Sequence, residues 1–420
     1  MTNAKPFDIP KREVWLAFKK VKANQGAAGV DGQSVAAFEA DLANNLYKLW
    51  NRLSSGSYFP PPVRRVDIPK ADGGMRMLGV PTVADRIAQE VVRRHLEPRL
   101  EPIFHADSYG YRPGRSAIDA VRTARQRCWR SDWVLDLDVQ AFFDSLDHEL
   151  LLRAVRHHTD APWVLLYVER WLKAPIQGED RALAPRVSGT PQGGVASPIL
   201  ANLYLHYAFD AWMARTYPGI PFERYADDAI CHCRSKHEAE SLRAALQERF
   251  AACGLTLHPQ KTRVVYCKDS NRRGTHPVIS FDFLGYTFRP RLAKWHGGRQ
   301  FGVSFLPAAA DKALKQIRRE IRSWGLQRRS DKSLQDLAAM FNAHIRGWIQ
   351  YYGQFYKSAL YETLRRVDVH LIKWARRKYR TLRYRAQGAV HWFMRVVRTS
   401  PGLFAHWQLL YATGRMSGAG

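Results

Sequence analysis

The feature that most constrains this chain is a pair of adjacent aspartates, Asp227 and Asp228, set between apolar residues that are typical of β-strands. A bare Asp-Asp pair is most often an ordinary turn or a helix cap. Here the strand-like flanks place the pair at the tip of a tight hairpin that projects from a sheet. Two carboxylates held this close repel each other unless a divalent cation lies between them, so the pair indicates a metal site.

A second stretch supplies another carboxylate for such a site. Residues 133–138 read W-V-L-D-L-D, an alternation that predicts a strand with Asp136 and Asp138 on one face. If this strand lies next to the hairpin, Asp138 comes beside Asp227. Oxygen ligands suit Mg²⁺, which takes a few carboxylates and keeps its other positions for water and substrate phosphates. A pair of such ions can activate a 3′ hydroxyl and stabilise a departing pyrophosphate.

The charge balance indicates a polyanionic partner. Lys and Arg number 65 against 38 Asp and Glu, which gives a formal net charge of +27. Cations that neutralise phosphates release counterions and supply most non-specific affinity for nucleic acids, whereas a merely soluble basic surface is the less specific alternative. No stretch approaches the roughly 20 apolar residues of a membrane span, so no membrane partner and a cytoplasmic location are expected.

Apolar periodicity predicts a mixed region followed by a helical bundle. Residues 12–60 have helical spacing, and two alternating runs separated by A-D-G-G indicate a β-hairpin. Beyond Phe305 three runs of helical spacing follow. Basic side chains beside aromatic ones on these helices can hold phosphates and stack on bases, although for any single residue a solvated face or a core position is the simpler interpretation. The candidates are Arg318, Arg322, Trp348, Tyr351, Tyr352, Arg376, Arg377 and Lys378.

Eight sequence blocks, in order, resemble those of the reverse transcriptases encoded by bacterial group II introns, also called maturases. D-L-D-V-Q-A-F-F-D resembles polymerase motif A, G-T-P-Q-G-G-V-A-S-P resembles motif B, and R-Y-A-D-D-A-I resembles motif C. R-G-W-I-Q-Y-Y-G-Q-F-Y, farther along, resembles the thumb of this family. The resemblance implies an α+β right-hand polymerase, in which fingers and palm combine an antiparallel sheet with helices and an all-helical thumb follows.

The same resemblance implies four segments. An N-terminal extension with part of the fingers, the reverse transcriptase core of fingers and palm, the helical thumb or maturase domain, and a short basic DNA-contacting segment would occupy residues 1–82, 83–305, 306–380 and 381–420. About 40 residues beyond the thumb are too few for the H-N-H endonuclease domain that many relatives append. We therefore expect no protein-dependent cleavage of the second target strand.

The resemblance also assigns the metal ligands. Asp138, Asp227 and Asp228 would bind two Mg²⁺ ions, with the backbone carbonyl of Val139 as a further ligand. Asp136 would have a structural role. In the loop S-Y-G-Y-R-P-G-R-S, which resembles another block of the family, the two arginines would contact nucleic acid; they are Arg112 and Arg115.

Contacts with the incoming nucleotide are implied in the same way. Lys70 and Arg76, on the two sides of the A-D-G-G turn, would bind the triphosphate. Lys261 would protonate pyrophosphate, although a lone lysine is more often plain surface.

Three further residues would shape the nucleotide site. Phe143 matches an aromatic gate that would clash with a ribose 2′-hydroxyl, and the alternative is a core phenylalanine. Gln192 and Gly193 would let the chain approach the template and the nascent base pair closely, because glycine has no Cβ to obstruct it.

The implied function is an RNA-directed DNA polymerase that assists splicing of its intron RNA and copies it into DNA during retrohoming. Its partners would be group II intron RNA, target DNA with the primer–template duplex, and deoxynucleoside triphosphates, in a ribonucleoprotein at the bacterial nucleoid. One alternative is a splicing-only RNA chaperone with a vestigial site, against which the three intact aspartates argue. Another is a domesticated polymerase of host defence or repair, which would share every catalytic residue.

Overall fold

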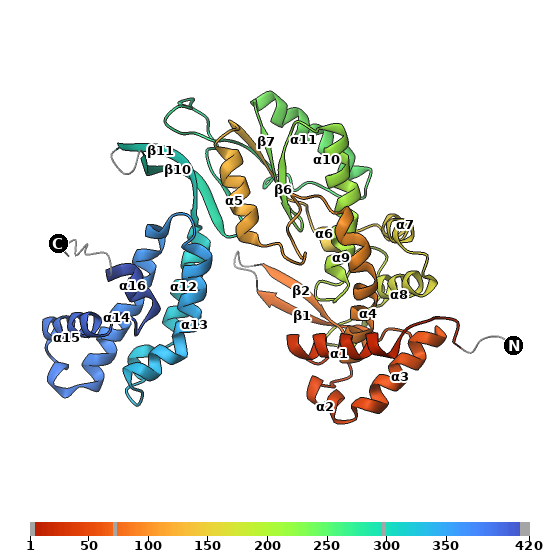
Figure 1. Cartoon of the computed structure of the whole chain (residues 1–420), viewed down its shortest axis with the longest axis horizontal. Helices are drawn as coiled ribbons and strands as arrows, with labels where there is room; N and C mark the ends of the chain where they lie inside the picture. The colour runs from red at the N-terminus through yellow and green to blue at the C-terminus, as the bar shows by residue number, and fades with distance from the viewer. Residues whose placement is uncertain (1–4, 70–73, 296–299, 412–420) are drawn as a thin grey trace. The chain divides into compact units, whose positions relative to one another are not determined.

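The structure, a computed structural model, describes residues 5–69, 74–295 and 300–411 of the chain (Figure 1). Helices and strands mix up to Ala309, and among the described residues only helices follow. The same ranges contain no helix that is long and apolar enough to cross a membrane. The chain is an α+β protein with a helical C-terminal region, as the sequence predicted.

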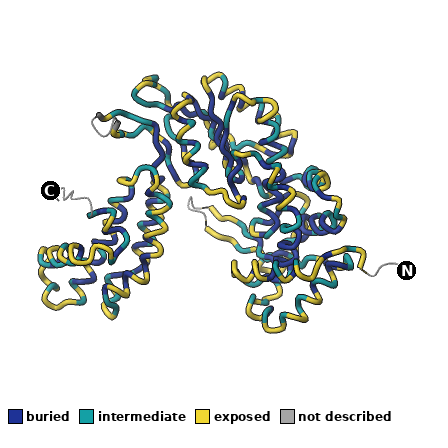
Figure 2. Tube along the Cα trace, in the orientation of Figure 1, coloured by how far each residue is buried: buried dark blue, intermediate teal, exposed yellow. Residues whose placement is uncertain are grey.

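Two compact units make up the chain. Unit 1 comprises Met1–Ala120 and Trp133–Val264, and unit 2 comprises Val121–Asp132 and Val265–Gly420. Each unit has its own buried interior, which is dark blue in Figure 2.

Unit 1 begins with helices and a hairpin, both predicted from the sequence. Helix α1 packs against α4, and strands β1 and β2 pair antiparallel. Strand β1 also pairs with β4, which gives a sheet of order β2-β1-β4-β5. The bounds are α1 Lys11–Asn24, α2 Val35–Ala40, α3 Leu42–Ser55, β1 Val63–Pro69, β2 Met75–Val80, α4 Val83–Leu100, η1 Glu101–Ile103, β4 Ile176–Gln177 and β5 Leu183–Ala184. Helix α5, Ala117–Cys128, begins in unit 1 and continues into unit 2.

A second sheet, of strand order β6-β7-β3-β8, carries the aspartates. Helix α11 packs against both central strands, β3 and β7 (Figure 1). The strands are β3 Trp133–Leu137, β6 Phe222–Tyr225, β7 Asp228–Cys233 and β8 Arg263–Tyr266. The helices are α6 Phe142–Ser145, α7 His148–His158, α8 Pro162–Lys173, α9 Ser197–Leu205, the π-helix η2 His206–Asp210, α10 Ala211–Thr216 and α11 Lys236–Ala251.

Unit 2 joins a three-stranded sheet of order β11-β10-β9 to a helical bundle. Helical spacing predicted the bundle, because the apolar residues of α12 to α14 recur on one side of each helix. The bounds are β9 Phe281–Phe283, β10 Tyr286–Trp295, β11 Gln300–Ala309, α12 Asp311–Ser323, η4 Leu326–Arg328, α13 Leu334–Tyr352, η5 Lys357–Leu360, α14 Tyr361–Lys378, η6 Arg380–Leu382, α15 Ala386–Thr399 and α16 Ala405–Tyr411.

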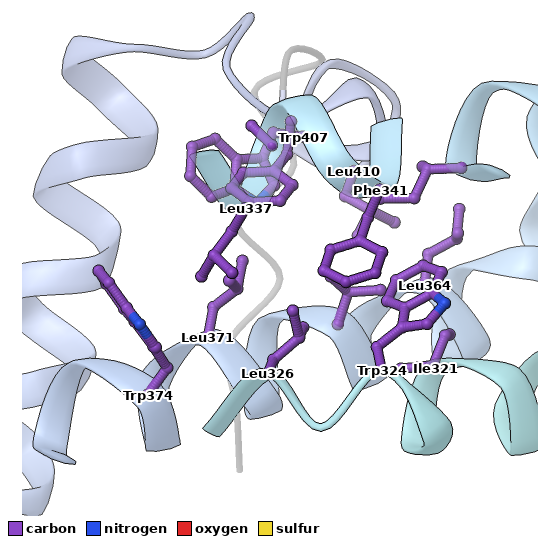
Figure 3. Close-up of a cluster of buried hydrophobic side chains, with 14 of the residues drawn as sticks. Ile321, Trp324, Leu326, Leu337, Phe341, Leu364, Leu371, Trp374, Trp407 and Leu410 are labelled. Carbon is purple, nitrogen blue, oxygen red and sulfur yellow. The ribbon is translucent and has the colours of Figure 1, made fainter. Parts of the chain in front are cut away.

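The bundle has one apolar core. Figure 3 shows its side chains directed toward one another, with the Trp324 ring stacked on Phe341 at a centroid distance of 4.4 Å. Helices α15 and α16 share this core through Phe393 and Trp407. The indole N–H of Trp407 also donates to the carboxylate of Asp368 at 2.9 Å. The last two helices are therefore part of the same folded bundle.

Replacing Trp407 by alanine should destabilise this bundle by about 3–5 kcal/mol, because it empties a buried site and leaves Asp368 with one donor fewer. Tyr384→Ala is the matched control, since that aromatic ring is 88% exposed, and we expect a change within about 0.5 kcal/mol. Denaturant unfolding followed by far-UV circular dichroism measures both. Equal unfolding midpoints for the two variants would contradict the packing described here.

Candidate active site

The two adjacent aspartates lie at the turn between β6 and β7, as predicted. Tyr225 pairs with Asp228, so Ala226 and Asp227 are the two turn residues. Ala226 has φ 57°, in the left-handed region that side chains with a Cβ rarely adopt. A two-residue hairpin turn demands a positive φ at its first central position. The turn therefore stores local strain next to the carboxylates, which is common at functional sites.

A buried arginine holds this turn from inside the fold. Arg224 is 1% exposed, and its Nε and Nη2 donate to the two carboxylate oxygens of Asp210 at 2.7 and 2.6 Å. Its Nη1 donates to the carbonyl of Ala226 at 3.0 Å and to the side-chain oxygen of Asn202 at 3.1 Å. Because the guanidinium is a rigid planar fork, these four bonds fix the position of the turn carbonyl.

The strand pairing brings the third aspartate to the turn. Strands β3 and β7 are antiparallel, with Leu137 opposite Ala229. Continuing this register by one residue puts Asp138, just after β3, opposite Asp228, the first residue of β7. The carboxylate of Asp138 lies 3.5 Å from the Nζ of Lys261. The structure thus brings together the three predicted aspartates and the predicted lysine.

The carboxylates at the turn also interact electrostatically. The carboxylate of Asp228 reaches solvent, yet the protein around it raises its pKa to about 7, and the charges of Asp227 and Asp138 add to the rise. Burial also raises the pKa of Asp227, with Asp138 contributing and Arg76 opposing. Lys261 opposes the rise of the Asp228 pKa. Negative charge at this position is therefore unfavourable unless a cation compensates it.

These residues fit a divalent cation by the chemistry of their donors. Carboxylates are hard oxygen ligands, and a cation would offset the burial and the neighbouring negative charges that together raise the pKa of Asp228. Val139, whose carbonyl was predicted as a ligand, follows Asp138 and bridges to Leu257. In the part of the chain that the structure describes, no three histidine, cysteine, aspartate or glutamate side chains already form a metal-binding group.

Asp136 lies on the same strand but has a different partner. Its carboxylate accepts a hydrogen bond from Nη2 of Arg263 at 3.2 Å, between β3 and β8. Burial raises its pKa to about 7, and Arg263 opposes the shift. An ion pair that joins two strands favours the structural role predicted for this residue.

The predicted triphosphate contacts are only partly visible. Arg76 is an exposed residue of β2, and its charge lowers the pKa of Asp227, so it lies within electrostatic reach of the turn. Lys70 lies outside the described residues. Their roles in nucleotide binding stay predictions.

Phe143 and its neighbour Phe142 are clearly different in burial. Phe142 is in the core, whereas Phe143 is only half buried and its carbonyl accepts the N–H of Thr190 at 2.7 Å. The core position that was the alternative for Phe143 is thus occupied by Phe142, and the aromatic gate stays the prediction for Phe143.

Gly193, in the loop of motif B, packs against another part of the protein. The N–H of Gly79 on β2 donates to the carbonyl of Gln192 at 2.7 Å. Gly193 has φ 117°, and a Cβ there would lie 2.6 Å from the Gly79 carbonyl oxygen. A glycine is thus required for the loop to pack against the β1–β2 hairpin, a reason other than the predicted approach to the template.

The two arginines of the S-Y-G-Y-R-P-G-R-S loop differ in exposure. Arg112 is 8% exposed, and its guanidinium donates to the Glu101 carboxylate at 2.7 Å and to the carbonyls of His105 and Ser108. These bonds brace the loop, so contact with nucleic acid would require Arg112 to give them up. Arg115 is exposed and is the better placed of the two.

The predicted aromatic surface of unit 2 is largely engaged inside that unit. Trp348 stacks on Trp324 at 5.4 Å, and the hydroxyl of Tyr351 donates to the carbonyl of Leu284 at 2.8 Å. Tyr352 lies against Gly285, where an added Cβ would be 3.3 Å from its ring. These rings are partly buried, so packing accounts for them without a nucleic acid.

The basic residues of unit 2 also have partners in the protein. Three of them donate to backbone carbonyls, and Arg318 donates to the hydroxyl of Thr363 at 3.1 Å. Arg322 is exposed. Their nucleic-acid contacts stay predictions. The bonds to carbonyls are Arg376 to Arg383, Arg377 to Gln327, and Lys378 to Ser330 and Lys332.

One residue that sequence reasoning missed lies at the same turn. Tyr111 has φ 58°, is 51% exposed, and has its ring 6.3 Å from that of Tyr225. Partial burial and the charge of Asp227 raise the pKa of its hydroxyl. A Cβ on Gly110 would lie 2.4 Å from the Ala226 nitrogen, so the loop packs directly on the turn. The sequence signal for this close packing is Gly110, the glycine between two tyrosines in the motif.

Comparisons with known proteins identify the family of the chain. Residues 68–288 match the family model for reverse transcriptase (RNA-dependent DNA polymerase), and residues 314–392 match that for the group II intron maturase-specific domain. The chain belongs to the reverse transcriptase family, in its group II intron maturase branch. This membership supports RNA-directed DNA polymerase activity, the use of divalent metal ions and the binding of nucleic acids. The fold accordingly corresponds to fingers and palm with a helical thumb.

Individual relatives cover the chain to different extents. It is 31% identical over 337 residues to Protein YkfC of Escherichia coli (strain K12), across 70% of this chain and 84% of that protein. It is 34% identical over 195 residues to the group II intron-encoded protein LtrA of Lactococcus lactis subsp. cremoris, across 46% of this chain and 32% of LtrA. It is 25% identical over 189 residues to nuclear intron maturase 4, mitochondrial, of Arabidopsis thaliana. The chain thus matches about a third of LtrA.

Replacing Tyr111 by glycine separates backbone strain from function. Glycine adopts φ 58° without cost, so the thermal midpoint should stay the same or rise. Primer extension on an RNA template should nevertheless fall about tenfold, the equivalent of about 1.4 kcal/mol, because the exposed ring beside Asp227 is lost. Tyr111→Phe keeps the ring and should extend normally. Full extension by Tyr111→Gly would assign the tyrosine no part in the reaction.

Proposed function

We propose that this protein is a group II intron reverse transcriptase that copies its intron RNA into DNA during retrohoming and binds that RNA to assist splicing. The observation that carries the proposal is the convergence of Asp138, Asp227 and Asp228 with Lys261 at one end of the β6-β7-β3-β8 sheet. Three carboxylates beside a cationic side chain are suited to phosphoryl transfer and have no evident structural purpose.

Asp138, Asp227, Asp228 and the carbonyl of Val139 would hold two Mg²⁺ ions. When bound, such ions supply the positive charge that activates a 3′ hydroxyl and stabilises a leaving pyrophosphate. Magnesium is favoured over softer metals because every donor in the set is an oxygen atom.

The side chains around the aspartates would position the nucleotide. Arg76 acts electrostatically on Asp227, and Lys261 lies beside Asp138; both would bind triphosphate oxygens, together with Lys70, which lies outside the described residues. Lys261 would deliver a proton to the departing pyrophosphate. The half-buried ring of Phe143 would exclude nucleotides with a 2′-hydroxyl.

The partners follow from this activity. They would be the intron RNA as template and splicing substrate, target DNA with its primer–template duplex, and deoxynucleoside triphosphates. A net charge of +27 supports binding to these polyanions. As a ribonucleoprotein with chromosomal targets, the protein would be found at the bacterial nucleoid.

Asp227→Asn keeps the shape of the turn residue but removes a charge that the metal ions need. Extension of a DNA primer on an RNA template should fall by several orders of magnitude, whereas binding of intron RNA should be retained. Asp160→Asn, at an exposed aspartate of the same unit, is the matched control and should extend normally. Near-normal extension by Asp227→Asn would sink the assignment, and intact splicing assistance with no extension in the wild type would favour the chaperone alternative.

Phe143→Ala should relax sugar selection, because the proposed gate acts by steric exclusion. The ratio of ribonucleotide to deoxynucleotide incorporation should rise by about 10- to 200-fold, the range that a steric pocket contact supplies. Phe301→Ala, at an exposed ring of unit 2, serves as the control. If single-nucleotide incorporation assays give the same ratio for both variants, the gate lies elsewhere.

A further inference from the structure

Unit 1 contains a cavity that includes none of the proposed metal or nucleotide ligands. Its volume is about 640 Å³, and three helical segments line it. On α7 the lining residues Leu150, Arg153, Ala154 and His157 have the spacing of one helix face. The other walls come from the junction of α9 with the π-helix η2 and from the end of α11. This volume is within the range of natural small-molecule sites and exceeds what one nucleotide requires.

The π-helix gives the cavity a fixed aromatic wall. Tyr207, in η2, is half buried, and its hydroxyl is hydrogen-bonded to Nε2 of His158 at 2.6 Å. Tyr204 lies behind it, and its hydroxyl donates to the carbonyl of Cys253. Segments of π-helix are rare and are frequent at functional sites. Because hydrogen bonds hold both rings, a planar ligand can stack there without ordering a mobile side chain.

The mouth of the cavity is strongly cationic. Arg153 and Arg156 are exposed, and within the described residues neither guanidinium has a hydrogen bond or ion pair. Arg249 donates to the carbonyls of Tyr207 and Ala208 at 2.9 and 3.2 Å, which steadies the π-helix from the third wall. No acidic residue is part of the lining. An anionic ligand therefore complements the cavity.

We propose that this cavity binds one unstacked nucleotide of a single-stranded RNA. The base would stack on Tyr207, and the phosphates on either side of it would pair with Arg153 and Arg156. Single-stranded RNA is recognised in this way, by aromatic stacking combined with cations for the backbone. An acidic peptide would pair with the arginines, but it does not carry an aromatic ring beside each negative charge as a nucleotide does. The site adds an RNA contact to the proposed function and does not depend on polymerase chemistry.

The test uses the full chain and a short single-stranded RNA carrying one 4-thiouridine. Irradiation should crosslink this base to the peptide that contains Tyr207, as mapped by mass spectrometry. The double variant Arg153→Ala/Arg156→Ala should lose the crosslink. It should also lower the slope of log affinity against log salt by about 1.4, because each phosphate contact on a single strand contributes about 0.7. Fluorescence anisotropy measures the slope.

Matched variants keep the test decisive. Arg243→Ala removes an exposed arginine of α11 outside the cavity and should leave both readouts unchanged. Tyr207→Phe keeps the ring and should retain the crosslink, whereas Tyr207→Leu should lose it. The double variant changes only exposed side chains, so its thermal midpoint should match that of the wild type.

Three results would overturn the proposal. They are a wild-type crosslink that maps away from the cavity, an unchanged salt slope in the double variant, or suppression of the crosslink by adenosine monophosphate or by an acidic peptide at concentrations equal to the RNA. The last result would assign the cavity to a free nucleotide or to a protein. Primer extension is recorded separately, so failure of the polymerase with an intact crosslink counts against the proposed function alone.

Discussion

The turn that carries Asp227 and Asp228 depends on one buried ion pair, between Arg224 and Asp210. The two side chains are 1% and 0% exposed, and an unpaired charge at that depth would be strongly destabilising. Each partner therefore requires the other, and Nη1 of the arginine donates to the turn carbonyl of Ala226 and to the side-chain oxygen of Asn202. Asn202 in turn donates to the carbonyl of Gly110 at 2.6 Å. This ion pair and its hydrogen bonds thus connect the turn with the π-helix that ends at Asp210 and with the loop that contains Tyr111.

This arrangement explains how two strained residues persist side by side. Ala226 and Tyr111 both have positive φ values, near 57° and 58°, although neither is glycine. Such conformations persist only where the surroundings determine them, and they cluster at functional sites. Here the Tyr109 N–H donates to the carbonyl of Arg224 at 2.8 Å, so the loop and the turn hold each other. The rigid support places Asp227 and Asp228 where their charges are unfavourable without a cation.

The sequence predicted those features that local patterns determine. Alternation of apolar residues predicted strand β3 and the turn with its adjacent aspartates, and helical spacing predicted α12 to α14. The sequence predicted Asp138 beside Asp227 if the two strands were neighbours; β3 and β7 are neighbours, and their register continues to Asp138 and Asp228. The order of the sequence blocks indicated the family, and the comparisons confirmed that resemblance. It also assigned roles to single residues, and those roles stay predictions.

What the sequence could not predict arises from contacts between residues far apart along the chain. Gly193 is explained by the carbonyl of Gly79, a partner that no local pattern reveals. Arg112 is of a residue type that often contacts phosphate, yet its guanidinium donates hydrogen bonds to Glu101 and to two backbone carbonyls. The cavity wall at Tyr207 requires a π-helix, which has no sequence signature of its own. In a chain this basic, an arginine is informative about binding only once its partners inside the protein are known. The guanidinium of Arg112 is engaged by such partners, whereas among the described residues those of Arg153 and Arg156 are not.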